Sequence, residues 1–293
     1  MSKTCRALYD DACQALREAG VPDPAFDAKR LMEFACGLTF HDLYAHGERV
    51  PNDSSQSLLN ECVKKRASRI PLAYITGTQG FMGLDFFVSA DVLVPRPDTE
   101  TLAEAAMKHL FDGMRLLDLC TGSGCVGLAL LRYSNDTTAV LCDLSPAAVD
   151  CAGENAKRLK LTERVTLAVC DLFPRRSLIP EGGFDLITAN PPYIKTDVID
   201  TLEDEVRFHE PRMALDGGAD GLVFYRRIVA EAERYLTRGG RLLLETGYDE
   251  ALAVASLMRE NGYGHIDIIR DAGGNERVVT GVMIPRATNG DLS

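Results

Sequence analysis

Seven short apolar runs, most of them separated by helix-forming segments, restrict the fold of this chain more than any other feature. Apolar runs of this length that alternate with helices indicate a parallel sheet wrapped by helices. The last two runs flank the turn-forming DAGGNE, a spacing too short for a parallel crossover. We therefore predict a seven-stranded α/β sheet with a terminal antiparallel hairpin. The runs are RLLDLC (115–120), TAVLCD (138–143), VTLAVC (165–170), FDLITAN (184–190), RLLLET (241–246), HIDII (265–269) and RVVTGVMI (277–284).

The start of the chain has a different pattern. Apolar residues recur at helical spacing over 4–19 and 24–38, and shorter helical patterns follow at 39–46 and 54–69. No strand-like alternation comes before about residue 72. We therefore predict a small helical bundle over 1–70.

Two changes of composition divide the rest of the chain. Between 71 and 96, glycines punctuate β-branched and aromatic residues, which predicts a β-hairpin connector. The α/β domain then occupies 97–285, and a short tail follows at 286–293. A length of 293 residues suits two domains of this kind.

The charge and the cysteines limit the class of partner and the compartment. The net charge is −11, and residues 1–85 hold 10 basic and 11 acidic residues, so the excess acid lies in the α/β part. This balance disfavours a protein that binds a phosphate backbone, and we expect no direct nucleic-acid binding. Nine cysteines without a CxxC pair indicate reduced thiols. With no signal-peptide or membrane-span pattern, we expect a cytoplasmic protein without membrane association. We also expect it to be a monomer.

A glycine loop follows the first strand of the predicted sheet. Gly122, Gly124 and Gly127 form GxGxxG ahead of a helix, and Asp143 ends the next strand. Glycines let the backbone approach a ligand, and an acid at that place accepts hydrogen bonds from a ribose diol. The loop predicts a nucleoside cofactor, for which NAD and S-adenosylmethionine both fit. Asp118 is either the partner of a methionyl amino group or a buried acid that caps backbone N–H groups.

A second motif, Asn190-Pro191-Pro192-Tyr193, ends the strand at 184–190. The prolines remove ladder hydrogen bonds and hold the preceding residues extended. The Asn190 side-chain oxygen and the Pro191 carbonyl can then accept the two hydrogens of one –NH2 group, and Tyr193 offers a flat face to a planar amide or base. Two acceptors favour attack by a conjugated amine on an electrophilic methyl group. The motif therefore favours S-adenosylmethionine over NAD.

These motifs, with PLAYITGTQGFMGLDFFVSADVLVPRPDTE, HEPRMALDGGADGLVFYRRI and DAGGNERVV, resemble the peptide chain release factor N5-glutamine methyltransferases, the PrmC/HemK family. The resemblance covers nearly the whole chain. Pro95-Arg96-Pro97, with Thr99 and Glu100, separates this family from other enzymes that carry NPPY. The resemblance implies a Rossmann-like class I S-adenosylmethionine methyltransferase sheet with an N-terminal helical domain for substrate recognition.

The resemblance also implies an activity and its site residues. Asn190, Pro191, Pro192 and Tyr193 would hold the glutamine amide of the Gly-Gly-Gln loop of a peptide chain release factor, which becomes N5-methylglutamine. Of these, Asn190, Pro191 and Tyr193 would form the catalytic set. The residues implied to contact S-adenosylmethionine are Cys120, Thr121, Gly122, Ser123, Gly124, Asp143, Asn190 and, on the adenine side, Leu172.

Three departures from the family pattern stand in or near these motifs. Cys120 takes the place of a usual glycine, which leaves the local backbone path open. Leu172 takes the place of a common aromatic residue, which weakens the expected stacking on adenine. The run ETGY (245–248) replaces the more usual Glu-Ile-Gly.

Other functions remain as alternatives. A nucleic-acid adenine N6-methyltransferase would flip a base into the same NPPY pocket, but the net charge of −11 disfavours it. A NAD-dependent oxidoreductase leaves NPPY unexplained. A catalytically dead binding protein would not need the intact motif residues.

Two polar features receive simpler interpretations. The five histidines have no metal-ligand spacing, and we predict no metal site. The densest basic cluster, Lys64-Lys65-Arg66 with Arg69, is interpreted as a solvated helix face that could also meet a ribosomal or release-factor surface.

Overall fold

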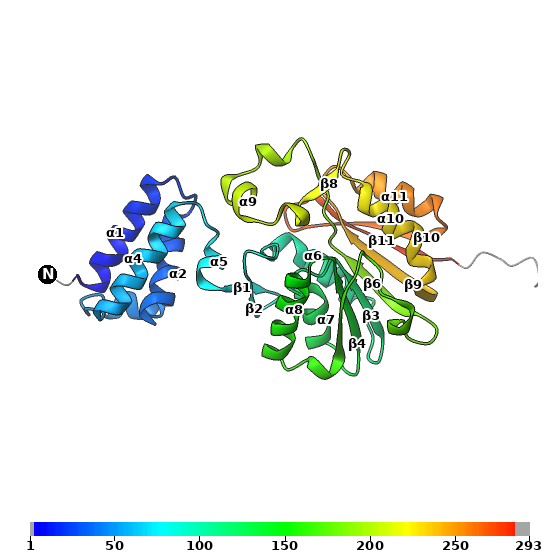
Figure 1. The fold of residues 1–293 in the computed structure, drawn as a ribbon, viewed down its shortest axis with the longest axis horizontal. Helices are drawn as coiled ribbons and strands as arrows, with labels where there is room; N and C mark the ends of the chain where they lie inside the picture. Colours follow the sequence, from blue (N-terminus) through cyan, green and yellow to red (C-terminus); the bar gives the residue numbers. More distant parts are fainter. Residues whose placement is uncertain (1–2, 285–293) are drawn as a thin grey trace, which may run out of the picture. The chain divides into compact units, whose positions relative to one another are not determined.

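The computed structural model describes residues 3–284, which form two compact units (Figure 1). The smaller unit comprises the residues up to Thr78 together with Glu203–His209. The larger comprises Gln79–Leu202 and the residues from Glu210 onward. The predicted tail at 286–293 lies outside the described residues. Within 3–284, no helix has both the length and the apolar character that a membrane span requires.

The smaller unit is a helical bundle whose main helices begin at capping side chains. Thr4, Asp23 and Asn52 each accept a hydrogen bond from a backbone N–H of the first turn that follows. Apolar residues such as Leu16 and Leu31, which are fully buried, form its core. The helices are α1 (Cys5–Glu18), α2 (Pro24–Cys36), α3 (Phe40–Ala45), α4 (Asp53–Ala67), α5 (Leu72–Thr76) and, from the later segment, α9 (Asp204–His209).

A buried ion-pair network joins α4 to α9 within this unit. Arg66 is 4% exposed, with Nε 2.5 Å from Asp27 Oδ2 and Nη2 2.7 Å from Glu205 Oε1. Arg69 also pairs with Glu205, at 3.2 Å. The interpretation of the basic cluster as a solvated face is therefore wrong for Arg66. Its partners lie 39 and 139 residues away in the chain, beyond the reach of a local charge pattern.

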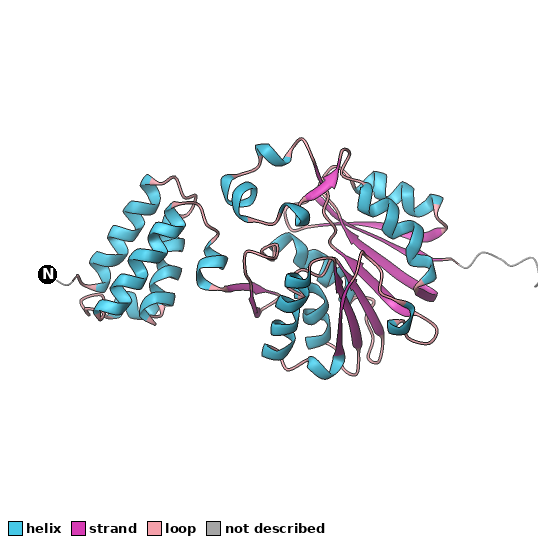
Figure 2. Cartoon of the chain, in the orientation of Figure 1, coloured by secondary structure: helices cyan, strands magenta, loops and turns pink. Residues whose placement is uncertain are grey.

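The larger unit is built on a seven-stranded sheet in the order β10-β11-β9-β6-β3-β4-β5 (Figure 2). The five strands from β9 to β5 run parallel, and β11 is antiparallel to both of its neighbours. The predicted sheet with a terminal antiparallel hairpin is confirmed. The strands are β3 (Arg115–Leu119), β4 (Thr138–Asp143), β5 (Val165–Val169), β6 (Phe184–Ala189), β9 (Leu236–Glu245), β10 (Tyr263–Arg270) and β11 (Glu276–Met283).

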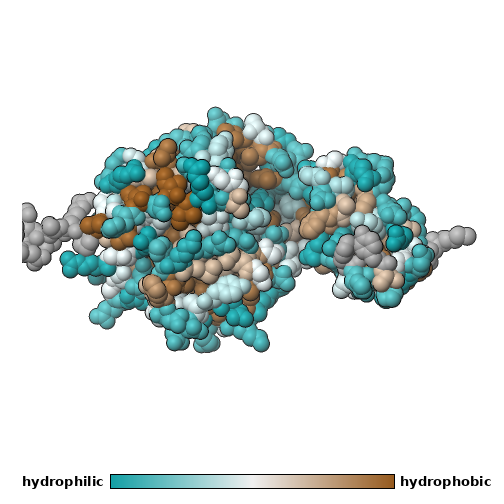
Figure 3. Space-filling view, turned by 180° about the vertical axis from the view of Figure 1, so that it is seen from behind, coloured by the Kyte–Doolittle hydropathy of each residue, from teal (hydrophilic) through white to brown (hydrophobic). Residues whose placement is uncertain are grey.

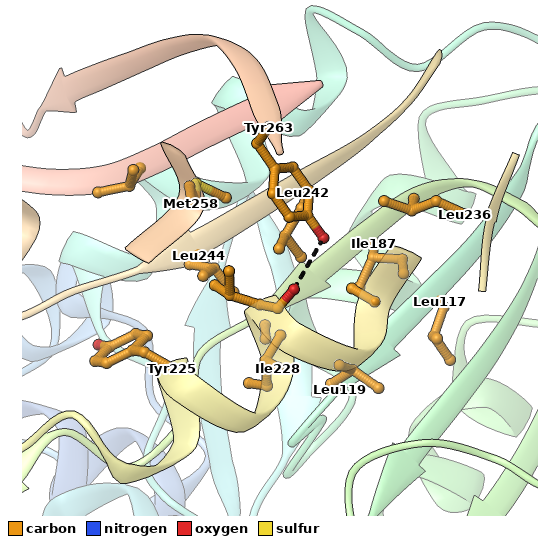
Figure 4. Packing of buried hydrophobic residues seen from close by; sticks show 14 of the residues in the cluster. Leu117, Leu119, Ile187, Tyr225, Ile228, Leu236, Leu242, Leu244, Met258 and Tyr263 are labelled. Atoms are coloured by element: carbon orange, nitrogen blue, oxygen red, sulfur yellow. Dashed lines mark hydrogen bonds between the residues drawn. The ribbon is translucent and has the colours of Figure 1, made fainter. Parts of the chain in front are cut away.

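Helices cover both faces of the sheet because successive strand residues point to opposite sides. Leu116 and Leu243 belong to the core beneath α6 (Pro97–Met107), α7 (Cys125–Arg132) and α8 (Pro146–Arg158). Leu117 and Leu242 belong to the core beneath α10 (Val223–Glu231) and α11 (Ala251–Glu260) (Figure 4). Both faces bury apolar side chains, which explains why the strands are continuous apolar runs.

A short hairpin lies at the start of the larger unit. It consists of β1 (Thr78–Phe81) and β2 (Leu84–Phe87), and α5 precedes it within the predicted connector. Phe81 and Phe86 are buried in the core beneath α6. At the turn, Met82 N donates to Glu100 Oε1 at 2.5 Å and Tyr133 Oη donates to Met82 O at 2.6 Å. The hairpin is therefore anchored to α6 and to the end of α7.

Three details differ from the sequence-based prediction. Strand β9 begins at Leu236 rather than at 241, because its pairing with β6 passes through an irregularity over the Gly239–Gly240 pair. A separate two-stranded sheet pairs β7 (Ile194–Lys195) with β8 (Asp216–Gly218). Both strands are too short to leave a pattern. Short 3-10 helices lie at Thr162–Arg164, Arg176–Leu178, Ile199–Thr201, Arg212–Ala214 and Ala232–Arg234.

Candidate active site

The glycine loop joins the end of β3 to α7 through left-handed backbone. Gly122 has φ 54° and Gly124 has φ 80°, a conformation that glycine adopts without strain. Cys120 has φ 52°, a left-handed conformation that favours glycine, which explains why glycine is usual at this position. A Cβ at Gly127 would lie 2.3 Å from a methyl carbon of Leu141, so α7 packs tightly on β4.

Asp143, at the end of β4, holds this loop through a hydrogen bond to its backbone. Its Oδ2 accepts from Gly122 N at 2.8 Å, and its Oδ1 accepts from Ser145 N at 3.0 Å. Burial raises the pKa of this carboxyl, and these backbone N–H groups oppose the rise. A carboxylate oxygen has more than one acceptor site. Asp143 can therefore hold the loop and still accept from a ribose diol.

Asp118 lies deeper, at 2% exposure, and both of its oxygens accept from hydroxyl groups. Thr121 Oγ1 lies 2.5 Å from Oδ2, and Thr188 Oγ1 lies 2.7 Å from Oδ1. Burial raises the pKa of Asp118 to about 6 despite these bonds and one from the Gly127 N–H. The bonds match the buried-acid interpretation, in which Asp118 ties the loop to β6.

The Asn190-Pro191-Pro192-Tyr193 motif follows β6 at the same edge of the sheet. Asn190 Nδ2 donates to Thr99 Oγ1, at 3.2 Å, on the first turn of α6. The chain around β8 crosses Tyr193 closely, since a Cβ at Gly217 would lie 2.6 Å from Tyr193 Cα. The Tyr193 ring packs against the core beneath α10 and α11, and burial raises its pKa.

One cavity brings the two motifs together, and it encloses about 1020 Å³ with its open mouth included. Most of the predicted site residues line it: Cys120, Thr121, Gly122, Ser123, Asp143, Leu172, Asn190 and Pro192. Gly124, Pro191 and Tyr193 are absent from its lining. Gly124 instead faces the interior, where a Cβ would lie 2.9 Å from Leu128.

The cavity also has walls that the motifs do not include. Arg96 and Thr99 come from the start of α6, and Phe224 comes from α10. Arg96 is oriented by Glu210, whose Oε1 lies 2.6 Å from its Nη2. Arg96 and Thr99 belong to the PRPDTE run that distinguishes the family in sequence, but the sequence did not indicate a role for either residue. Phe224 carries no local signal, because an aromatic residue in a helix usually belongs to a core.

The cavity fits a polar nucleoside cofactor. Ser123 is 2% exposed and lines the cavity, and its hydroxyl has no close hydrogen-bond partner among the described residues, with only the weakly polar Cys125 thiol facing it. A buried hydroxyl of this kind requires a partner, which a bound ligand would supply. Within residues 3–284, no group of three or more His, Cys, Asp or Glu side chains could hold a metal ion.

The sheet order, the glycine loop and the acid at the end of β4 define a class I S-adenosylmethionine-dependent methyltransferase. Residues 7–77 match the family model described as PrmC N-terminal domain, and 110–281 match that of a methyltransferase domain. The chain belongs to the release factor glutamine methyltransferase family, and the predicted family and cofactor are confirmed.

Two relatives illustrate the extent of the match. The release factor glutamine methyltransferase of Caulobacter vibrioides is 38% identical, over 97% of this chain and 98% of that protein. The one of Moorella thermoacetica is 40% identical, over 94% and 96%. Among solved structures, the hMettl16 catalytic domain is 15% identical with a TM-score of 0.52, over 80% of this chain and 85% of that one, and shares the fold alone.

Proposed function

We propose that this protein transfers the methyl group of S-adenosylmethionine to the side-chain amide nitrogen of glutamine in the Gly-Gly-Gln loop of peptide chain release factors. The observation that carries this proposal is the placement of Asn190 in the cavity wall, with its Nδ2 already bonded to Thr99. Its Oδ1 is then the atom available to accept from a substrate –NH2 group.

The chemistry of the acceptor explains what the site must do. An amide nitrogen is a poor nucleophile because its lone pair is delocalised into the carbonyl. Acceptors on both N–H groups, Asn190 Oδ1 and the Pro191 carbonyl, stabilise the positive charge that develops as nitrogen attacks. The cofactor supplies an electrophilic methyl group on a sulfonium. The protein then contributes mainly orientation. For Tyr193, whose ring packs against the core and does not line the cavity, we propose the flat support of the amide once substrate is bound.

The cofactor half of the cavity has residues suited to the rest of that molecule. We assign the ribose to Asp143 and the adenine side to Leu172, with the loop residues 120–123 and Asn190 along the remainder. Gly124, predicted as a contact, does not line the cavity, and we assign it only the turn of the loop. Leu172 is an aliphatic wall, so it contributes apolar burial in place of ring stacking.

We assign substrate recognition to the helical unit. Its near-neutral charge does not repel a protein partner, and Phe26 and Phe34 on α2 are about half exposed. A release-factor substrate places the reaction in the cytoplasm, where translation terminates. We expect the enzyme to act as a monomer, without binding nucleic acid directly.

The experiment that tests this function offers labelled S-adenosylmethionine and purified chain to three acceptors in parallel. These are a release factor, the same factor with Gln→Ala in its Gly-Gly-Gln loop, and duplex DNA. We expect label on the unaltered factor alone. Label on DNA alone would replace this function by the adenine N6-methyltransferase alternative, and equal label on both factors would reject the Gly-Gly-Gln glutamine as acceptor.

A further inference from the structure

A buried carboxyl lies behind Asn190 that neither motif includes. Glu245, the last residue of β9, is 1% exposed, and its Oε2 has no hydrogen-bond partner among the described residues. Its backbone is held on two sides, since Tyr225 Oη donates to its carbonyl at 2.8 Å and Val278 pairs with it in β11. A buried carboxyl without a full set of donors is destabilising. A fixed position of this kind therefore points to a role beyond packing.

Thr99 connects this carboxyl to the substrate motif. It is 3% exposed, lines the cavity, and accepts from Asn190 Nδ2 at 3.2 Å. The Thr99 and Asn190 side chains also face Glu245, and as possible hydrogen-bond donors they oppose the effect of its burial, which raises its pKa to about 7. The first turn of α6 and the ends of β6 and β9 thus bring three polar side chains together around the hydrogen bond from Asn190 to Thr99.

The ionised carboxyl of Glu245 fixes which of the three side chains donates and which accepts in each hydrogen bond. A carboxylate can only accept, so the Thr99 hydroxyl must donate to it. The Thr99 oxygen then has a lone pair free to accept a hydrogen bond from Asn190, so the –NH2 group of Asn190 must be the donor. This leaves Asn190 Oδ1 for the cavity. If the amide of Asn190 were reversed, it would present a donor to the substrate –NH2 group and could not accept from it.

We propose that Glu245 and Thr99 are positioning residues for methyl transfer, which fix the Asn190 amide with Nδ2 inward and Oδ1 toward the bound substrate amide. This inference rests on the proposed function of the same site. Neither residue touches the reacting atoms; both act through Asn190.

Charged groups from several elements face Glu245 and set its ionisation. Arg277 on β11 lies near enough to lower its pKa, and Asp98 on α6 raises it. Arg277 also pairs with Asp98 at 3.0 Å and with Asp271 at 3.1 Å, so its charge is shared. Tyr193, Tyr225 on α10 and Cys125 on α7 are further titratable groups that face Glu245. Protonation lets Glu245 donate to Thr99, and the direction of the group is then lost.

The first test compares two variants at one position. Thr99→Val keeps the shape and removes the hydroxyl, whereas Thr99→Ser keeps the hydroxyl. With a release factor as substrate, we expect Thr99→Val to lower kcat about tenfold or more, a typical loss for a residue that orients another. Thr99→Ser should stay within about threefold of the unaltered enzyme. Equal losses in the two variants, or none in Thr99→Val, would overturn the proposal.

The second test separates orientation from folding. Glutamine can donate or accept, so we expect Glu245→Gln to lower kcat by about the same factor as Thr99→Val. We expect kcat of the unaltered enzyme to fall below about pH 7, and this fall should be absent in Glu245→Gln. Binding of S-adenosylmethionine, measured by calorimetry, checks that each variant is folded. An unchanged pH profile in Glu245→Gln would reject the role of Glu245. Failure of the unaltered enzyme to methylate any release factor would instead reject the proposed function.

Discussion

The two ends of the cavity are built in different ways. At the cofactor end, backbone geometry makes the site: left-handed residues turn the loop, and Asp143 holds the Gly122 N–H at 2.8 Å. At the substrate end, side chains make it, since Asn190 is held by Thr99 and, behind it, by Glu245. A backbone loop can be specified by a few adjacent residues, whereas an arrangement of side chains needs partners from distant parts of the chain.

The largest expected effect lies at the substrate end. Asn190→Ala removes one of the two acceptors of the substrate amide, and we expect kcat to fall by about 10²–10³. Release-factor methylation in single-turnover conditions measures this loss. Asn261→Ala, on the far end of α11, is the matched control and should leave turnover unchanged. Near-normal turnover in Asn190→Ala would show that this end does not work through side chains.

The next prediction concerns the cost of keeping Glu245 buried. Its pKa rises from 4.5 to about 7 on folding, so between these pH values the folded chain holds a proton that the unfolded chain has lost. Stability therefore falls as pH rises from about 4.5 to 7 and levels off above that, by about 3 kcal/mol from this group. Urea unfolding at pH 5 to 8 should show a smaller fall in Glu245→Gln.

Glu250 and Asp118 also have raised pKa values, of about 7 and about 6, so they add a fall of the same sign. Both remain in Glu245→Gln, which is why only the difference between the two proteins reports on Glu245. A difference that stays constant from pH 5 to 8 would contradict the assigned shift.

A third prediction tests the cofactor end. Asp143→Ala removes the ribose acceptor and the brace of the Gly122 N–H, and we expect S-adenosylmethionine affinity to fall about tenfold or more. Calorimetry measures the change, with Asp150→Ala, an exposed acid on α8, as control. An affinity equal to that of the control would remove Asp143 from the cofactor site.

The smallest effect is expected at Cys120. Cys120→Gly relieves a left-handed backbone, worth about 1 kcal/mol, but loses thiol burial and makes the unfolded chain more flexible. These terms oppose one another, so we expect unfolding free energy to change by less than about 1 kcal/mol, with cofactor affinity within about threefold. A larger loss of affinity would mean that the thiol itself contacts the ligand.

Much of the α/β unit could be predicted because its inner strands are buried on both faces and therefore form continuous apolar runs in the sequence. The start of β9 could not, since Gly239 and Gly240 resemble a turn until pairing with β6 decides otherwise. The burial of Arg66, beside two lysines in the same basic cluster, could not be predicted from the sequence either. Its acidic partners come from α2 and α9, and only the folded chain brings them within 2.7 Å.

The candidate site divides in the same way. Asn190 and Asp143 stand at strand ends within recognisable motifs, so the class of cofactor and the kind of amine that the site suits could be predicted from local sequence. In the sequence, Glu245 stood out only as the first residue of the ETGY run, with no indication of its role. Its place behind Thr99 and Asn190 depends on β9 and β6 being neighbours in the sheet and on α6 packing across their ends. The position of Glu245 therefore follows only from the tertiary structure, because hydrogen bonds depend on which atoms lie close together in the folded chain.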